Sequence, residues 1–260
     1  MNERTTQKIS VVIVCKNEAH IIGRTLQSVR SFAAEVLVYD TGSTDDTMDI
    51  ARAANATVVQ RGWEGYGKTK QQAVALAQHH WVLNLDADEV LNDEAQAAVR
   101  QLSLNDETIC YRFRFINHLG SKALHWGEFG FDSHVRLFHR KQVAWNDAPV
   151  HEKLVMGKGV KEQLLKGTIL HYTMKNTAEF VQKSVSYALT NAANYFERGK
   201  RATWTKQYLA PPFIFVKYYF FRLGFLDGWA GLFSARMAVL YTYVKYARLR
   251  ELWENGSNVQ

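Results

Sequence analysis

The chain has 260 residues, of which 47% are hydrophobic and 22% charged, and a formal net charge of +7. This length can bury a full core within the single-domain range, with an added C-terminal segment. Only two cysteines are present, Cys15 and Cys110, and their distant positions in strand-like runs predict free buried thiols in a reducing compartment rather than a disulfide framework. Residues 1–8 are polar and lack the apolar segment of a signal peptide, so we expect a cytoplasmic protein.

The first hundred residues alternate between two patterns. Strand-like apolar runs cover 9–15, 35–40, 56–60 and 81–86, and helical patterns lie between them at roughly 18–31, 44–54 and 66–79. This alternation predicts an α/β fold with a mainly parallel sheet and right-handed crossovers. Ligands of such sheets bind at the carboxyl ends of the strands.

The fourth strand ends in two carboxylates, Asp86 and Asp88, separated by one residue. Side chains two positions apart on a strand project to the same side, so the pair can share one divalent cation. Hard oxygen ligands suit Mg²⁺ or Mn²⁺, which bind through one or two carboxylates plus a substrate diphosphate. A D-x-D pattern alone is common by chance, and its position at a strand end is what makes it informative.

Two further polar segments fall on the same edge, 16–18 and 40–46. Asp40 at the end of its strand can accept a hydrogen bond from a nucleotide base. The alternative is a purely structural turn, because Ser43 and Asp46 have the spacing of a helix N-terminal box. Asn17 and Glu18 also allow both interpretations, since Glu in a first helical turn is favoured by the helix dipole.

Taken together, these segments resemble the family 2 inverting glycosyltransferases, which have a GT-A nucleotide-sugar-binding fold. The family pattern of a strand ending in N-E, a strand ending in D-D-G-S-T-D and a later D-x-D is similar to 11–18, 38–47 and 86–88 here. The resemblance implies that Glu18 and Asp40 hold uridine, Asp86 the ribose or a metal-bound water, and Asp88 the metal. Thr41 departs from the family pattern, which leaves the base identity open.

Residues 62–72 are rich in glycine and lysine. Gly62 to Thr69 match the Walker A expression, but that loop belongs after the first strand of its sheet, and an ATPase would leave the D-x-D pair without a role. We therefore expect Lys68 and Lys70 to lie near the donor and to neutralise its diphosphate.

Beyond residue 108 the segments 109–116 and 134–140 alternate apolar and polar residues, as half-exposed antiparallel strands do. This half is expected to recognise the acceptor. Residues 136–140, 150–152 and 224–228 resemble a bacterial subgroup that includes lipopolysaccharide inner-core β-1,4-glucosyltransferases, which implies acceptor-side roles for Arg136, Arg140 and His151.

An inverting transfer needs a general base within hydrogen-bond reach of the acceptor hydroxyl. Glu152 is favoured, Asp132 is second, and Glu128 or His151 is less favoured; the alternative for Glu152 is a structural ion pair with an arginine. Most of the nine histidines have no metal-ligand spacing. His171 is the exception, because related enzymes often bring a late histidine to the metal.

The positive charge is concentrated in residues 200–260, which contain nine Lys or Arg but three Asp or Glu. The same segment is rich in aromatic residues, a combination that suits an anionic membrane surface better than nucleic acid. The charged residues Lys217, Arg222, Asp227, Arg236 and Lys245 recur too often for a membrane-spanning helix. The alternative is that these aromatic residues are core.

The sequence thus predicts a catalytic domain over 1–200, divided into a nucleotide-sugar half (1–107) and an acceptor half (108–200), and a basic aromatic helical tail over 201–260 that lies on the inner face of the cytoplasmic membrane. The predicted activity is metal-dependent transfer of a single sugar, from UDP-glucose, to the lipopolysaccharide core. The alternatives are a polyprenyl-phosphate glycosyltransferase and, more distantly, a basic nucleic-acid-binding protein.

Overall fold

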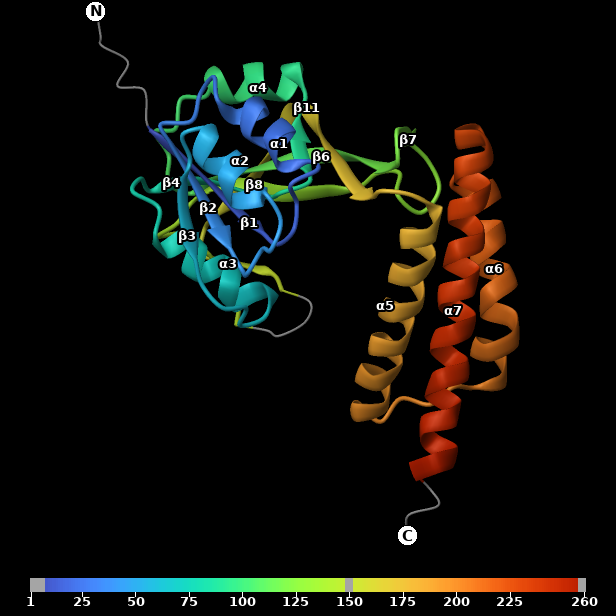
Figure 1. Cartoon of the computed structure of the whole chain (residues 1–260). Helices are drawn as coiled ribbons and strands as arrows, with labels where there is room; N and C mark the ends of the chain where they lie inside the picture. Colours follow the sequence, from blue (N-terminus) through green and yellow to red (C-terminus); the bar gives the residue numbers. More distant parts are fainter. Residues whose placement is uncertain (1–7, 148–151, 257–260) are drawn as a thin grey trace, which may run out of the picture. The chain divides into compact units, whose positions relative to one another are not determined.

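A nine-stranded sheet runs through the computed structural model, which describes residues 8–147 and 152–256 (Figure 1). The strand order is β3-β2-β1-β4-β8-β6-β11-β5, with β7 paired to β6. The chain forms two compact units, of which the first contains residues 1–115 and 133–171 and the second residues 116–132 and 172–260.

The first four sheet neighbours are parallel, as the alternating pattern predicts. They are β1 (Ile9–Cys15), β2 (Glu35–Asp40), β3 (Thr57–Gln60) and β4 (Trp81–Asp86), and the intervening helices are α1 (Ile22–Val29), α2 (Thr47–Ala53) and α3 (Tyr66–Ala75). β1 lies between β2 and β4, and Val11, Val12 and Ile13 are fully buried there. Both faces of this strand meet core side chains, which is why its sequence is a continuous apolar run.

The helix α1 begins later than the helical pattern suggested. Residues 18–21 form a turn in which the carbonyl of Glu18 accepts hydrogen bonds from the amides of Ile21 and Ile22. Asn17 just before this turn has a positive φ of 56°, a backbone conformation that Asn tolerates better than most residues. The polar segment after β1 is therefore a loop at the sheet edge rather than a helical turn.

The antiparallel half completes the first unit. It contains β5 (Glu89–Leu91), α4 (Asp93–Arg100), β6 (Ile109–Leu119), β8 (Ser133–His139), β9 (Val143–Trp145), β10 (Leu154–Met156) and β11 (Lys161–Met174). β8 was expected to be half exposed, but it lies in the sheet between β4 and β6, and its residues from Val135 to His139 are buried. The polar side chains of this strand therefore need partners inside the protein.

The second unit is mainly helical, and α5, α6 and α7 lie side by side in Figure 1. Its elements are β7 (Lys122–Leu124), α5 (Thr177–Glu197), the π-helical turn η1 (Thr205–Leu209), α6 (Ala210–Val216), the π-helical turn η2 (Lys217–Phe221), the 3-10 turn η3 (Gly224–Asp227) and α7 (Gly228–Gly256). Phe180 of α5 and Ala230 of α7 share a core cluster with Leu119, Leu124 and Met174.

This division differs from the boundary expected at residue 200. α5 and α7 pack along each other, and the buried carboxylate of Asp227 accepts hydrogen bonds from the amides of His125 (3.2 Å) and Trp126 (2.8 Å). Residues 201–256 are therefore not an appended tail, because they share a core with α5 and with the 116–132 segment. Among the helices of the described residues, none has the length and the apolar character needed to span a bilayer.

Candidate functional site

The carboxylate of Asp86, at the end of β4, is held between two cations. The Nζ atom of Lys70 lies 2.9 Å from its Oδ1 atom, and Nη2 of Arg136 lies 3.6 Å from its Oδ2 atom. Burial by itself would raise the pKa of Asp86, but Lys70 and Arg136 lower it well below its ordinary value. Glu152 is also close, with Oε1 3.7 Å from Nζ of Lys70. Asp86, Lys70, Arg136 and Glu152 thus form one charged cluster.

Lys70 reaches this cluster from the buried side of α3. Its side chain is 9% exposed, and its ammonium group lies 4.9 Å from the centre of the Trp145 ring. The indole of Trp145 donates a hydrogen bond of 2.8 Å to the side chain of Asn84 on β4, which fixes the ring. Because the ring also contacts the lysine as a cation–π partner, the ammonium position is well defined.

Arg136 on β8 owes its position to Glu89, a residue that the sequence analysis did not select. The guanidinium donates two hydrogen bonds to Glu89, Nε to Oε2 at 2.8 Å and Nη2 to Oε1 at 2.6 Å. Glu89 is completely buried and also accepts a hydrogen bond from the backbone amide of Asp86. The sequence did contain a signal for Glu89, because this acid directly follows the D-x-D pair at the end of a buried strand. An acid buried there needs a cationic or hydrogen-bonding partner.

Asp88 meets His171, as the metal hypothesis requires. Oδ2 of Asp88 lies 3.5 Å from Nε2 of His171, and the backbone of His171 is the register partner of Glu89 in the β5–β11 ladder. Burial alone would lower the pKa of His171, but the contact with Asp88 and the charges of Glu89 and Asp86 raise it overall.

The donor set of Asp88 and His171 fits a cation that takes most of its ligands from elsewhere. No group of three or more His, Cys, Asp or Glu side chains that could hold a metal ion occurs among residues 8–147 and 152–256. A cation held by Asp88 and His171 would therefore need further oxygen ligands from a diphosphate and water, which is how Mg²⁺ is usually held beside substrate phosphates.

Two cavities of the first unit share Lys70 and Asp86. One has a volume of about 450 Å³ and opens beside β1 and β2, where its lining includes Glu18, Thr41, Trp63, Tyr66 and Asp88. The other has a volume of about 420 Å³ on the antiparallel side, where its lining includes Arg112, His134, Arg136, Trp145, Glu152 and Lys153. Both volumes lie in the usual range for small-molecule sites. The shared residues thus lie where two bound molecules would meet.

The structure corrects the role expected for Asp40. Its carboxylate is fully buried and accepts hydrogen bonds from the amides of Gly42 (2.9 Å) and Ser43 (2.8 Å), from the Ser43 hydroxyl and from Gln60 (3.3 Å). Burial would raise the pKa of Asp40, but these hydrogen bonds lower it overall. Contact with a base would require breaking them, so the carboxylate shapes the loop. Thr41, which differs from the family pattern, lines the cavity beside β1 and β2 instead.

Asn17 also builds the loops. Its side-chain oxygen accepts a hydrogen bond of 2.8 Å from the backbone amide of Thr44, and its backbone amide donates a hydrogen bond of 2.8 Å to the hydroxyl of Ser43. Glu18 lines the cavity beside β1 and β2, and its backbone amide donates to the hydroxyl of Thr47 at 2.8 Å. The expectation for Glu18 is therefore compatible with its position, whereas Asn17 joins two loops to each other.

Lys68 does not reach the cluster that contains Lys70. Its ammonium group pairs with Glu64 one helical turn earlier, and both side chains are exposed. The loop of the Walker A match follows β3, the edge strand of the sheet, and Thr69 is buried, with its hydroxyl accepting a hydrogen bond from the amide of Glu64. This arrangement gives the ATPase interpretation no support.

Arg140 is placed at the opposite edge of the sheet, so its expected acceptor-side role is corrected. Its guanidinium donates to the carbonyls of Val74, Ala75 and Ala77 at the end of α3, the shortest contact being 2.6 Å. Its backbone amide donates to His80, just before β4 begins. The arginine therefore caps a helix C-terminus, a common use of that side chain.

The remaining candidates are His151, Asp132 and Glu128. His151 lies outside the described residues. Asp132 and Glu128 belong to the second unit, where Asp132 contacts the side chain of Asn117 at 3.5 Å. Among the proposed bases that the structure describes, Glu152 is the one in the first unit, beside Asp86 and Lys70.

Comparison with known families assigns the chain. The family model described as "Glycosyl transferase family 2" matches residues 10–153. This range is more than half of the sequence and extends from β1 through β4 to Glu152. The chain therefore belongs to glycosyltransferase family 2. The expected architecture of this family, a GT-A sheet with parallel strands, added antiparallel strands and C-terminal helices, is confirmed.

Several relatives are similar over nearly the whole chain. An "uncharacterized glycosyltransferase" of Rickettsia typhi is 28% identical over 97% of this chain and 90% of its own length. A protein of Rhizobium meliloti named "Lipopolysaccharide core biosynthesis glycosyltransferase LpsC" is 25% identical over 93% of this chain and 91% of its own length. A solved structure of glucosyl-3-phosphoglycerate synthase from Mycobacterium tuberculosis has a TM-score of 0.36 and 25% identity, and covers 44% of this chain and 46% of its own.

The buried pair of Glu89 and Arg136 predicts a stability difference between two Glu→Gln variants. Glu89→Gln removes the nearer of the two carboxylates that pair with the buried Arg136 guanidinium, so we expect a loss of roughly 3 kcal/mol in the free energy of unfolding, measured by urea denaturation. Glu162→Gln removes a partner of Arg112 whose side chain is 36% exposed, and should cost less than about 1 kcal/mol. Equal losses for the two variants would show that Glu89 does not hold Arg136 in place.

Proposed function

We propose that this chain is an inverting glycosyltransferase that transfers one glucose unit from UDP-glucose to the inner core of lipopolysaccharide. The observation that carries the proposal is the pair of cavities meeting at Lys70 and Asp86, with the carboxylate of Glu152 beside them. The acceptor class rests on the similarity to the Rhizobium meliloti relative, whose name states a role in lipopolysaccharide core biosynthesis.

The cavity beside β1 and β2 suits the nucleotide. Thr41 and Glu18 offer hydrogen-bonding groups, and the rings of Trp63 and Tyr66, which are 47% and 45% exposed, can pack against a base. Lys70 lines this cavity and would supply positive charge for a diphosphate, together with Arg136, which lies 3.6 Å from Asp86. Asp86 is the proposed partner of the ribose or of a metal-bound water. A Mg²⁺ or Mn²⁺ ion held by Asp88 and His171 would add electrostatic stabilisation of the leaving diphosphate.

The second cavity suits the acceptor, with Glu152 as the general base. The Glu152 carboxylate accepts the proton of the acceptor hydroxyl while that oxygen forms a bond to the anomeric carbon, and the bond from that carbon to the diphosphate breaks on the opposite face. The departing diphosphate gains negative charge next to Lys70 and Arg136. Because Asp86 and Glu89 hold these cations in advance, little reorganisation is needed at that moment.

A panel of nucleotide sugars tests the donor, with Mg²⁺ or Mn²⁺ present and release of nucleoside diphosphate followed. We expect UDP-glucose to react faster than GDP- or CMP-linked sugars, with truncated lipopolysaccharide core as acceptor and one sugar added. Faster transfer to a polyprenyl phosphate would favour that alternative. Salt-dependent oligonucleotide binding without UDP binding would overturn the proposal.

Asp88→Ala should abolish metal-dependent UDP binding and transfer together. Loss of this carboxylate removes a metal ligand and leaves the diphosphate charge poorly compensated. The measurement is UDP titration calorimetry with and without Mn²⁺, together with turnover. Asp49→Ala serves as a matched control, since its side chain is 78% exposed on α2 and should have no effect. Near-normal turnover of Asp88→Ala would rule out the metal assignment.

Glu152→Gln should lower turnover by roughly 10² or more and leave UDP binding unchanged, because the amide cannot accept the proton. Steady-state kinetics and UDP titration measure the two quantities separately. If Asp132→Asn has this effect and Glu152→Gln does not, the catalytic roles must be exchanged.

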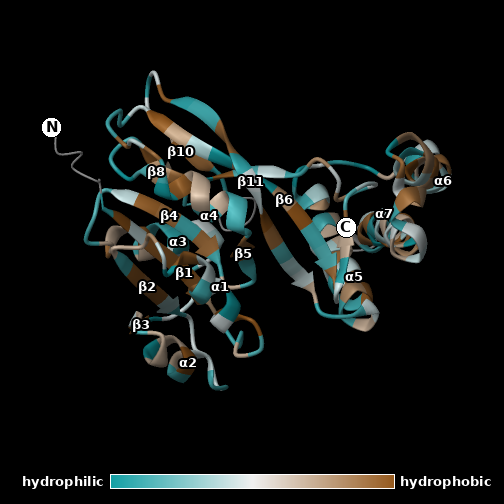
Figure 2. Ribbon diagram, turned by 90° about the horizontal axis from the view of Figure 1, so that it is seen from above, coloured by the Kyte–Doolittle hydropathy of each residue, from teal (hydrophilic) through white to brown (hydrophobic). Residues whose placement is uncertain are grey.

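The second unit is proposed to dock on an anionic membrane surface, which would bring the enzyme to a lipid-linked acceptor on the inner face of the cytoplasmic membrane. Several aromatic residues of the 204–229 segment are exposed, among them Trp204 (66%), Phe213 (59%), Phe221 (74%) and Trp229 (60%). Hydrophobic segments of α6 and α7 are visible in Figure 2. Lys217 and Arg222 of the same segment both lie over the ring of Tyr218 and are proposed to attract lipid headgroups.

The double variant Phe220→Ser, Phe221→Ser should weaken binding to phosphatidylglycerol vesicles by about tenfold or more and leave UDP binding intact. Cosedimentation with vesicles at low and high salt measures this binding, and the binding of the unmodified full-length protein should decrease as the salt concentration rises. Leu189→Ser, an exposed site on α5, is the control. Truncation near residue 205 is unsuitable, because it removes the part of the core that α7 supplies. Unchanged vesicle binding by the double variant would contradict the proposal.

A further inference from the structure

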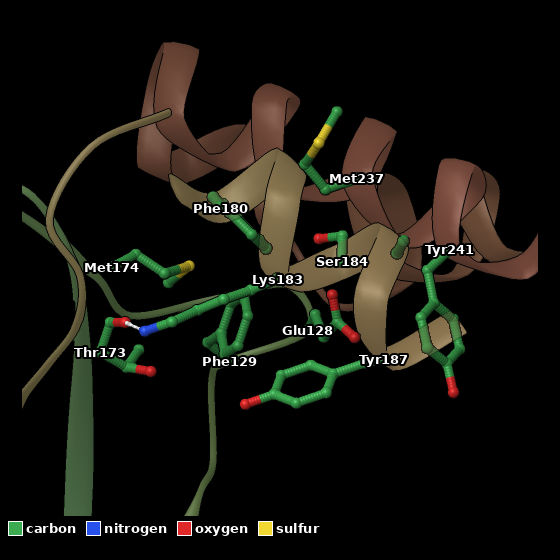
Figure 3. Close-up of a pocket in the computed structure, with 11 residues that line it drawn as sticks. Glu128, Phe129, Thr173, Met174, Phe180, Lys183, Ser184, Tyr187, Met237 and Tyr241 are labelled. Carbon is green, nitrogen blue, oxygen red and sulfur yellow. Dashed lines mark hydrogen bonds between the residues drawn. The ribbon is translucent and has the colours of Figure 1, made fainter. Parts of the chain in front are cut away.

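A cavity of about 200 Å³ lies within the second unit, and nothing in the proposed transfer reaction uses it. It is walled by α5, α7, the end of β11 and the 128–129 segment, as Figure 3 shows. Most of the wall is apolar or aromatic, from Phe129, Met174, Phe180, Tyr187, Met237 and Tyr241. The volume corresponds to roughly seven water molecules, which is enough for a ligand of about seven heavy atoms.

One acidic group lines this cavity. In Figure 3 the carboxylate of Glu128 lies between the side chains of Ser184 and Tyr187. Glu128 has no hydrogen bond or ion pair with any residue in the described part of the chain. An ionised carboxylate in such surroundings is costly unless a counter-charge or a donor is supplied. Burial, opposed by the charges of Arg222 and Lys217, raises the pKa of Glu128 to about 7.

The neighbouring cations are engaged with other groups. The ammonium group of Lys183, which also lines the cavity, donates to the carbonyl of Thr173 at 2.7 Å and lies 3.1 Å from Glu179. Arg222 donates to the carbonyl of Gly130 at 3.1 Å, and the ammonium group of Lys217 lies over the ring of Tyr218. Among the described residues none of these cations forms an ion pair with Glu128, so a ligand can supply the direct partner.

We propose that this cavity binds a small primary or quaternary ammonium group, with Glu128 as its counter-ion and Tyr187 and Tyr241 as aromatic walls. A carboxylate combined with aromatic faces attracts an ammonium group through both charge and cation–π contact. The apolar remainder of the wall suits the methyl or methylene groups attached to the nitrogen. Such a group occurs on free amines and on lipid headgroups that carry ethanolamine or choline. The site is independent of the proposed glycosyl transfer.

The affinity for an ammonium ligand should depend on pH in a defined direction. Glu128 is largely protonated and neutral below about pH 7 and ionised above it, so affinity should rise as pH increases through that value. The other charged or titratable groups near this carboxyl are Lys183, Lys217, Arg222, Tyr187, Tyr218 and Tyr241, and no histidine lines the cavity. Burial raises the pKa values of Tyr218 and Tyr241.

Isothermal titration of the full chain with choline, and with its uncharged carbon isostere 3,3-dimethylbutan-1-ol, tests the proposal. We expect choline to bind at millimolar concentration with at least about tenfold preference over the isostere. The preference should grow with pH through about 7. Glu128→Gln should remove both the preference and the pH dependence. Glu197→Gln, an exposed acid at the end of α5, is the matched control and should behave as the unmodified chain does.

A second variant covers the case in which Glu128→Gln does not fold. Tyr187 lines the cavity but is 55% exposed, so Tyr187→Ala should fold and weaken choline binding several-fold through loss of a ring face. Vesicles of phosphatidylglycerol with and without phosphatidylethanolamine distinguish a lipid headgroup from a free amine as the ligand. If the vesicles that contain phosphatidylethanolamine compete with choline, the ligand is a headgroup. If they do not compete, the ligand is a free amine. Equal binding of choline and its isostere, no binding of choline, or undiminished binding by Glu128→Gln would overturn the proposal.

Discussion

The contact of Asp86 with Lys70 and Arg136 is the interaction on which the rest of the site depends. One carboxylate at the end of β4 draws a lysine from α3 and an arginine from β8 to the same point. Two cations this close would repel each other without the negative charge between them. The cluster therefore fixes where a diphosphate can be neutralised, and it does so before any substrate is bound.

Such a cluster is costly to bury, and the surrounding residues show how the cost is offset. Arg136 lies on a strand in the middle of the sheet, where its guanidinium donates two hydrogen bonds to Glu89. Lys70 is covered by Trp145, whose indole is in turn fixed by Asn84. Each charged group has a partner that is itself held, so the geometry does not depend on a flexible side chain. Electrostatic catalysis requires this kind of preorganisation.

The acids of the two units have different kinds of partner. In the first unit the acids near the cluster have cationic partners, as Glu89 does. In the second, Asp227 is satisfied by two backbone amides, whereas Glu128 has no counter-charge within hydrogen-bond distance among the described residues. Native proteins rarely retain an acid without a direct partner in apolar surroundings, so Glu128 indicates that its cavity has a function.

The sequence by itself determined the parallel half of the sheet, because a continuous apolar run such as β1 has few alternatives to a buried strand. It also placed Asp86 and Asp88 together at a strand end, since that follows from strand geometry alone. Only the tertiary structure decided which long side chains join them. Lys68 and Lys70 are the same residue type on the same helix, but only Lys70 is on the face that turns toward the core. Arg136 is near Asp86 only because β8 pairs with β4. Contacts between distant segments depend on strand order, which local pattern does not encode.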